Sequence, residues 1–297
     1  MVIRATVTAL LLSLASLAHA TITLTGADGK KLALSAPAMR VVSLAPDLTE
    51  LVYAAGAGSV MVGAGTYSDY PAAAKRLPRI GDAFRVDTER LLALKPDLVL
   101  AWQGGTPVSV IARLRTLKLP VLVIGANAPE DIASNLELIG QATGHATEAD
   151  AAARTFLAGL MELRNEYARR DPVRVFYEIS AAPLYTIGNK QLISRMIGLC
   201  GGRNIFDDLE SFAAPVSLED VLARDPQAIV TGDDPDAATR LRQWQRWPQL
   251  SAVRTRNLFN ISGDLLDRAT PRILGGGRQL CKDLETTRQS LDSPIGN

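Results

Sequence analysis

The side chains that most often perform catalysis or bind metal ions are scarce in this sequence. Of the two histidines, only His145 lies beyond the first 20 residues, and a Ser–His–Asp or Cys–His arrangement would have to use it. A zinc or manganese site normally gathers several histidines. Asp264 and Asp267 are close enough in sequence for acid–base chemistry, but a solvated loop explains them better. The sequence therefore argues against an enzyme and a metal-ion receptor, and it predicts no cofactor.

The only two cysteines, Cys200 and Cys281, are far apart in the sequence. A metal or redox pair would need closer spacing and histidine partners. In an oxidising compartment two cysteines usually pair, and we therefore predict one disulfide bond. It would close a loop of about 80 residues, which stabilises a fold by about 4 kcal/mol on the chain-entropy model.

Three residues suited to binding an organic ligand follow predicted strands. Pro46 follows the strand 40–45, Tyr67 lies in the loop after the strand 60–65, and Trp102 follows the strand 98–101. In open parallel sheets, ligand groups come from loops at the carboxyl ends of the strands. We therefore expect these side chains at one ligand-binding edge.

The elements that position these loops occur twice. Residues 89–100 contain a short amphipathic helix, a proline turn and an apolar strand, and residues 219–230 repeat this plan 130 positions later. Upstream of each copy, a predicted helix ends at a glycine, at Gly56 and at Gly201. Two α/β lobes of similar plan predict a ligand cleft between them.

A predicted long helix separates the two lobes. It covers residues 147–170, and its length indicates a rigid spacer. We predict an N-terminal lobe over 21–146, a connecting helix over 147–172 and a C-terminal lobe over 173–297. At the start of the helix after Pro46, Asp47 and Glu50 have the spacing of an N-cap and capping box.

Residues 1–20 read as a secretory signal peptide, with Arg4, an apolar run and Ala18-His-Ala20 as the cleavage site. The mature chain would have 297 − 20 = 277 residues, with 31 basic and 31 acidic side chains once Arg4 is removed. This balance shows no basic stripe for nucleic acid. We expect an exported protein that is monomeric when free and has a small molecule or a protein as its partner.

Several motifs combine these features in one pattern. They are residues 41–46 (VVSLAP), 67–71 (YSDYP), 94–98 (LKPDL), 101–105 (AWQGG), 199–206 (LCGGRNIF) and 264–272 (DLLDRATPR). Together they resemble the periplasmic cobalamin-binding proteins of ABC importers, over nearly the whole mature chain. The resemblance implies two Rossmann-like lobes of α/β class, joined by a single long helix, with the ligand cleft between them and the periplasm as location.

The resemblance also implies which residues meet a corrinoid ligand. A flat, partly apolar macrocycle edged with amides suits aromatic faces and a few polar groups. In the family, residues at the positions of Tyr67 and Trp102 contact it from the first lobe. The second lobe contributes the segment 264–268, and further cleft positions match Pro46 and Tyr185. The residues of the segment are Asp264, Leu265, Leu266, Asp267 and Arg268.

Two positions depart from the family pattern. Where related proteins can carry tryptophans, this chain has Phe84 and Phe212 nearby; either these residues serve as apolar walls or the pocket is wider. The corrinoid could therefore be cobalamin, cobinamide or another precursor. A haem- or ferric-siderophore-binding receptor of the same fold is the alternative: Tyr67 could ligate haem iron, whereas a siderophore receptor should show several cleft arginines, and only Arg268 and Arg85 qualify.

The two copies of the repeat each begin with a glutamate, Glu89 and Glu219. In the family, one surface glutamate on each lobe docks onto arginines of the membrane permease dimer. An acidic residue at a helix N-terminus also complements the helix dipole. We expect both roles for these residues.

Overall fold

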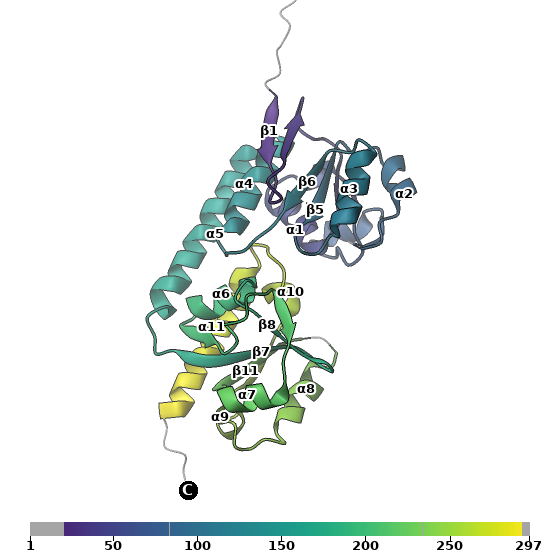
Figure 1. Cartoon of the computed structure of the whole chain (residues 1–297). Helices are drawn as coiled ribbons and strands as arrows, with labels where there is room; N and C mark the ends of the chain where they lie inside the picture. Colours follow the sequence, from purple (N-terminus) through teal and green to yellow (C-terminus); the bar gives the residue numbers. More distant parts are fainter. Residues whose placement is uncertain (1–20, 83, 234, 293–297) are drawn as a thin grey trace, which may run out of the picture.

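The computed structural model describes residues 21–82, 84–233 and 235–292. The predicted signal peptide, residues 1–20, lies outside the described residues. Two α/β lobes are connected by the long helix α5 (Ala146–Tyr167), which runs along one side of the molecule (Figure 1). This architecture confirms the predicted fold class. In the described part of the chain, no helix has the length and apolar character needed to cross a membrane.

The N-terminal lobe contains a parallel sheet of four strands in the order β4-β3-β5-β6, preceded by an antiparallel hairpin of β1 and β2. All three pairings in the four-stranded sheet are parallel. The elements are, in chain order, β1 (Ile22–Thr25), β2 (Lys31–Leu34), β3 (Val41–Ser43), α1 (Pro46–Ala54), η1 (Gly58–Val60), β4 (Met61–Ala64), η2 (Ala72–Arg76), α2 (Thr88–Ala93), β5 (Leu98–Trp102), α3 (Val108–Thr116), β6 (Val121–Ile124) and α4 (Asp131–Thr143).

The C-terminal lobe contains a mixed sheet of six strands, in which β9-β7-β11-β12 is a parallel set and the antiparallel strands β8 and β10 extend one edge. The elements are β7 (Val173–Ala181), β8 (Leu184–Ile187), α6 (Leu192–Leu199), β9 (Gly202–Asn204), β10 (Ala213–Pro215), α7 (Leu218–Arg224), β11 (Ala228–Gly232), α8 (Ala237–Trp244), α9 (Ser251–Arg254), β12 (Leu258–Ile261), α10 (Gly263–Leu266) and α11 (Ile273–Asp292).

The sequence repeat is visible in the hydrogen bonds of the two sheets. In the first lobe, Arg40 Nε donates to the carbonyl oxygen of Lys95 (3.1 Å), and in the second lobe Arg174 Nε donates to that of Asp225 (3.0 Å). Lys95 and Asp225 both have a positive φ, of 45° and 41°. They occupy the same place in their copies, directly before the proline. The same local conformation is therefore held by the same interaction in both lobes.

The connecting helix is packed into the core rather than free in solvent. One hydrophobic cluster contains buried side chains of both lobes and of α5, among them Phe156 and Leu160. Each lobe also has a smaller cluster of its own. A helix that shares its core with both lobes fits a stiff connection. The lobe boundaries at 146/147 and 172/173 stay a prediction. The helix α5 itself covers most of the segment 147–172 that was assigned to the connection.

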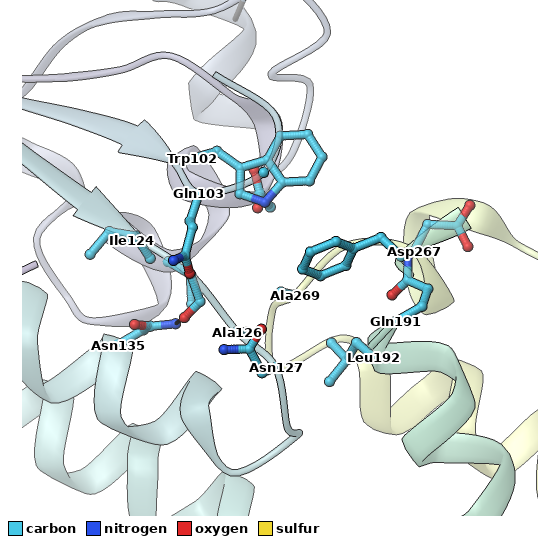
Figure 2. A pocket seen from close by; sticks show the side chains of 15 residues that line it. Trp102, Gln103, Ile124, Ala126, Asn127, Asn135, Gln191, Leu192, Asp267 and Ala269 are labelled. Carbon is cyan, nitrogen blue, oxygen red and sulfur yellow. Dashed lines mark hydrogen bonds between the residues drawn. The ribbon is translucent and has the colours of Figure 1, made fainter. Parts of the chain in front are cut away.

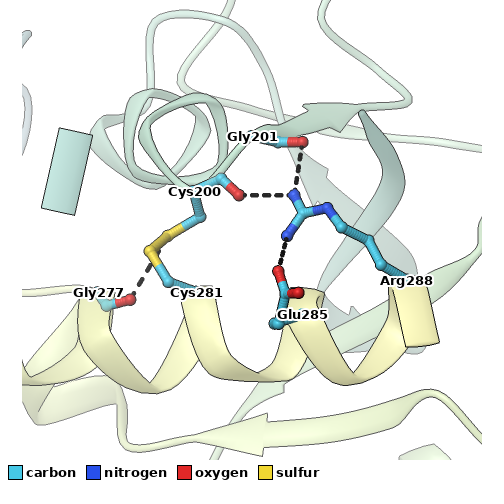
Figure 3. The surroundings of a disulfide bond; sticks show 6 residues. All are labelled: Cys200, Gly201, Gly277, Cys281, Glu285 and Arg288. Atoms are coloured by element: carbon cyan, nitrogen blue, oxygen red, sulfur yellow. Dashed lines mark hydrogen bonds and ion pairs between the residues drawn. A yellow bond between two sulfur atoms is a disulfide. The ribbon is translucent and has the colours of Figure 1, made fainter. Parts of the chain in front are cut away.

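A disulfide bond joins Cys200, at the end of α6, to Cys281 in α11, with an S–S distance of 1.99 Å (Figure 3). Both cysteines are fully buried. The Arg288 side chain of α11 donates hydrogen bonds to the carbonyl oxygens of Cys200 (2.9 Å) and Gly201 (3.0 Å). These contacts satisfy carbonyl groups at the C-terminal end of α6. The disulfide prediction is confirmed.

The start of α1 differs from the prediction. Ala45 is the N-cap residue, Pro46 occupies the first helical turn, and no side chain caps this end. The capping-box assignment of Asp47 and Glu50 is therefore wrong. Proline at the first turn needs no N–H partner and starts the helix by its fixed φ. Both acidic side chains are consequently available for other contacts.

Candidate functional site

A cavity of about 180 Å³ lies between the two lobes. Its walls come from the ends of α1, β5 and β6 in the first lobe, and from the start of α6 and the segments around Phe212 and α10 in the second. Figure 2 shows Trp102 and Gln103 on one side, and Gln191, Leu192 and Asp267 on the other. The lining residues are Asp47, Leu51, Trp102, Gln103, Gly104, Ile124, Gly125, Ala126, Asn127, Asn135, Gln191, Leu192, Phe212, Asp267 and Ala269.

Trp102 forms the aromatic part of the first wall. It ends β5, and its backbone N–H donates to the Thr106 hydroxyl (3.0 Å), which closes the turn. A Cβ atom at Gly105 would lie 1.6 Å from the indole ring, so a side chain there would displace the tryptophan. The indole is 40% exposed. Trp102 therefore presents a supported aromatic face to the cleft, where the sequence placed it.

Phe212 is the aromatic residue of the opposite wall. Its backbone carbonyl accepts a hydrogen bond from the N–H of Gly188 (3.2 Å), which ties this loop to the segment after β8. Its ring is 48% exposed. One exposed aromatic side chain from each lobe thus borders the cavity.

Asp47 is a polar residue at this cavity whose role the sequence analysis missed. It is largely buried in the first turn of α1, and desolvation raises the pKa of its carboxyl group to about 6. Backbone N–H groups of its own turn counteract part of this shift, and the nearby Glu50 adds to it. A carboxylate held where burial disfavours its charge is typical of functional sites.

Amide side chains make up most of the remaining polar lining. Gln103 Nε2 donates to the Ala27 carbonyl (3.1 Å), and Asn135 Nδ2 donates to the Gly125 carbonyl (3.0 Å). Gln191 and Asn127 complete the set. None of these four amides was predicted from the sequence as a site residue. The only sequence feature that indicates these amides is their position after a strand or before a helix. Many surface residues share such a position.

Asp267 belongs to the second wall, and a side chain of the C-terminal sheet holds it in position. The Tyr177 hydroxyl on β7 donates to Asp267 Oδ1 (2.8 Å). Burial, and next the negative charge of Asp267, raise the pKa of the Tyr177 phenol well above its usual value. The phenol therefore stays a neutral hydrogen-bond donor, and it fixes the predicted site residue Asp267 at the cavity edge.

Arg268 does not reach the cavity but connects the two lobes. Its guanidinium contacts the carboxylates of Glu50 (2.6 Å), Asp69 (3.1 Å) and Asp264 (2.6 Å). The buried Glu50 also binds Arg272 at 3.0 Å. Glu50 and Asp69 belong to the first lobe, whereas both arginines belong to the second. The guanidinium predicted to contact ligand is thus occupied by ion pairs across the lobe boundary.

The other predicted contact residues fall into three groups. Leu266 is fully buried in the core, so its predicted ligand contact is wrong. Outside the cavity lining, Tyr67 and Phe84 are 75% and 67% exposed. Partly buried residues outside the lining are Pro46, Tyr185, Asp264 and Leu265. Their predicted contacts, like those of Trp102 and Phe212, stay predictions.

Glu89 and Glu219 occupy matching places on the two lobes. Each is exposed and lies in the first turn of its helix, α2 or α7. The helices are capped by the side chains of Asp87 and Ser217, respectively. Among the described residues, neither glutamate takes part in an ion pair within the chain. Both carboxylates are therefore accessible to a partner.

The described residues contain no cluster of three or more His, Cys, Asp or Glu side chains that could hold a metal ion. The molecule combines two α/β lobes, a connecting helix that shares its core with both lobes, and a cavity with aromatic and amide side chains between the lobes. Together they define a two-lobed binding protein with a candidate ligand site at the lobe boundary.

Comparisons with known proteins agree with this class. The family model described as "Periplasmic binding protein" matches residues 41–265, and the chain belongs to this family. The chain is 37% identical over 254 residues to a vitamin B12-binding protein of Vibrio cholerae serotype O1, covering 85% of this chain and 91% of that protein. It is 38% identical over 259 residues to a vitamin B12-binding protein of Yersinia pestis, covering 87% and 89%.

A solved structure shows the same similarity in three dimensions. The periplasmic vitamin B12-binding protein of Vibrio cholerae superposes with a TM-score of 0.80 at 37% identity, covering 85% of this chain and 99% of that chain. The predicted family resemblance is confirmed. So are the predictions of a binding protein rather than an enzyme, and of a periplasmic location.

Proposed function

We propose that this protein captures cobalamin or a related corrinoid in the periplasm and delivers it to the permease of an ABC importer. The observation that carries the proposal is the cavity at the lobe boundary, bordered by Trp102 from one lobe and Phe212 from the other. The relatives named for vitamin B12 binding share more than a third of their residues with this chain over most of its length, which supports the choice of ligand class.

The size of the cavity indicates how a macrocycle would bind. Pockets that enclose a drug-sized ligand measure about 300–1,000 Å³, whereas this cavity measures about 180 Å³. It is too small to enclose a corrin ring. The ring would therefore stay at the cavity mouth, against the exposed faces of Trp102 and Phe212. One edge of the ring would point into the cavity. Aromatic faces suit a flat, partly apolar ring.

Equilibrium dialysis tests the ligand class. Purified mature protein would be dialysed against cyanocobalamin, cobinamide, haemin and a ferric siderophore in parallel. We expect saturable 1:1 binding of the corrinoids and no comparable binding of the other two ligands. Saturation by haemin or the siderophore without corrinoid binding would retain the family and reject the ligand. Recovery of chemically unchanged ligand distinguishes capture from turnover.

Delivery to a permease is the second part of the proposal. Glu89 and Glu219 are exposed, begin equivalent helices and lie one on each lobe. A partner with two-fold symmetry presents the same basic groups twice, and a pair of matched acidic residues fits such a surface. Charged pairs at the rim of an interface set orientation and association rate. These two carboxylates are the contacts that we propose for docking.

A further inference from the structure

The charge of the lobe-boundary cavity is one-sided. Its lining contains the carboxylates of Asp47 and Asp267, and none of the described lining residues is Lys, Arg or His. The remaining polar side chains are the neutral amides of Gln103, Asn127, Asn135 and Gln191. An anionic group that enters this cavity therefore meets negative charge without a basic side chain in the lining to balance it.

Two arginines in the segment that follows Asp267 do not reverse this balance. Arg268 binds Glu50, Asp69 and Asp264, and Arg272 shares Glu50 and lies over the ring of Tyr70, 4.0 Å from its centroid. The carboxylates that bind these two guanidinium groups are those of Glu50, Asp69 and Asp264, and the charge of Arg268 offsets only a minor part of the desolvation of Asp47. Both guanidinium groups are held by acidic partners that are part of the fold.

We propose that this cavity receives one uncharged amide side chain from the edge of the ligand, and that Asp47 makes it reject a carboxylate at the same position. The inference rests on the proposed corrinoid function and names the chemical group that the cavity distinguishes. The cavity of about 180 Å³ is small enough to hold a substituent rather than the ring.

The chemistry of the two groups explains the discrimination. An amide N–H₂ group donates hydrogen bonds, so it can pair with the Asp47 carboxylate and with amide oxygens of the lining. A carboxylate of the same shape only accepts, and it would place a second negative charge beside the desolvated carboxylate of Asp47. Like charges across an interface are strongly unfavourable. Each amide side chain of the lining carries both donor and acceptor atoms, so the amides contribute affinity rather than selectivity.

Cyanocobalamin derivatives in which single peripheral amides are hydrolysed to acids provide the test. Each derivative keeps the ring and changes one edge group from neutral to anionic. Titration of the full mature protein at pH 8 should show one derivative that binds at least about tenfold more weakly than cyanocobalamin, because its acid replaces the amide that enters the cavity. The other derivatives should bind within about threefold of cyanocobalamin.

Variants of Asp47 connect this selectivity to the cavity. Asp47→Asn should bring the rejected derivative to within about threefold of cyanocobalamin, whereas Asp47→Glu keeps the charge and should keep the rejection. Asp267→Asn, on the opposite wall, should relax the rejection in part; it serves as the second variant if Asp47→Asn does not fold. Asp150→Asn changes net charge equally on the exposed surface of α5 and should have no effect.

The outcomes separate this inference from the proposed function. Equal binding of cyanocobalamin and all its acid derivatives, or a rejection that persists in both Asn variants, would overturn the inference and leave corrinoid binding intact. Failure of the wild type to bind cyanocobalamin at all would overturn the proposed function, and the inference with it.

Discussion

The two lobes share an outer plan but differ where they face each other. Both build a parallel four-stranded set in equivalent order, and both hold the turn before a proline with an arginine from the neighbouring strand. At the cleft, however, the first lobe contributes Trp102 and Asp47, and the second contributes Phe212, Gln191 and Asp267. The two lobes are alike at the helices that bear Glu89 and Glu219, whereas the two walls of the cavity differ.

This difference suits two kinds of partner. A dimeric permease presents equivalent surfaces to the two lobes, so matched outer faces serve it. An asymmetric small molecule presents different groups to each lobe, so unlike walls serve it. The C-terminal lobe also carries the disulfide, and its main sheet is extended by two antiparallel strands, whereas the antiparallel hairpin of the N-terminal lobe forms a separate sheet. The comparison therefore predicts effects specific to one lobe and effects shared by both.

The largest expected effect belongs to the C-terminal lobe. Replacing Cys200 and Cys281 with alanine should lower the free energy of unfolding by about 4 kcal/mol, since the cross-link closes a long loop. Urea denaturation measures the loss, and hydrogen exchange should show more opening in β7 than in β3. A reductant should reproduce the loss in the wild type and change nothing in the double variant. Equal opening of both sheets would contradict a stabilising effect of the disulfide bond that is confined to the C-terminal lobe.

A second pair of effects concerns one buried carboxyl group in each lobe. Burial raises the pKa of Asp47 and of Asp283 to about 6 each, from 3.8. Because the folded pKa of each exceeds its unfolded value, each ionised group costs stability above pH 6, and this cost disappears as the pH falls towards 4. Asp47→Asn and Asp283→Asn should each raise the free energy of unfolding at pH 7.5, by about 3 kcal/mol at most.

Denaturation at pH 4 and pH 7.5 checks this prediction. The gain in each variant should be present at pH 7.5 and nearly absent at pH 4. Asp150→Asn, on the exposed surface of α5, is the control and should show no gain at either pH. A gain at pH 4 equal to that at pH 7.5 would show that ionisation of the carboxyl group is not its cause.

The matched glutamates give a test that depends on both lobes. In cells that rely on this protein for cyanocobalamin uptake, Glu89→Ala and Glu219→Ala should each lower uptake about tenfold, with the double variant lower still. Cyanocobalamin binding by the purified variants should not change. Glu137→Ala, an exposed glutamate of α4, is the control. Normal uptake by the double variant would show that these residues are not part of the docking surface.

The smallest expected effect tests the equivalence of the two repeats. Arg40→Ala and Arg174→Ala each remove hydrogen bonds to the turn before a proline. Each should lower the free energy of unfolding by about 1 kcal/mol, and the two losses should agree closely. Thermal denaturation of the two variants, with Arg113→Ala on the exposed face of α3 as a control, would show whether the interactions are equivalent.

The fold could be predicted from the sequence because its signals are local and occur twice. The helix–proline–strand unit, the glycines after α1 and α6 and the apolar strand runs each report on adjacent residues. The helix α4 was missed, although Ile132, Leu136 and Ile139 have helical spacing and Gly144 ends it with a positive φ of 75°. The same reasoning from local residue spacing could have predicted this helix.

The site was less predictable because its contacts are distant in sequence. Trp102 and Phe212 could be named, but Asp47 and Glu50 were assigned to a capping box. Glu50 instead binds Arg268, 218 positions away. No local pattern indicates such a pairing, since it depends on how the lobes meet. The same holds for the amide side chains, which become a set only at the boundary between the lobes.

Calorimetric titration of cyanocobalamin into four proteins tests the central claim most directly: the wild type, Trp102→Ala, Phe212→Ala and Met161→Ala. Met161 is exposed on α5, away from the cleft lining. We predict 1:1 binding by the wild type and by Met161→Ala, and a loss of affinity of at least about tenfold in each cleft variant, because a large aromatic contact is removed. Unchanged affinity in both cleft variants would place the ligand elsewhere and contradict a site formed by the two unlike walls.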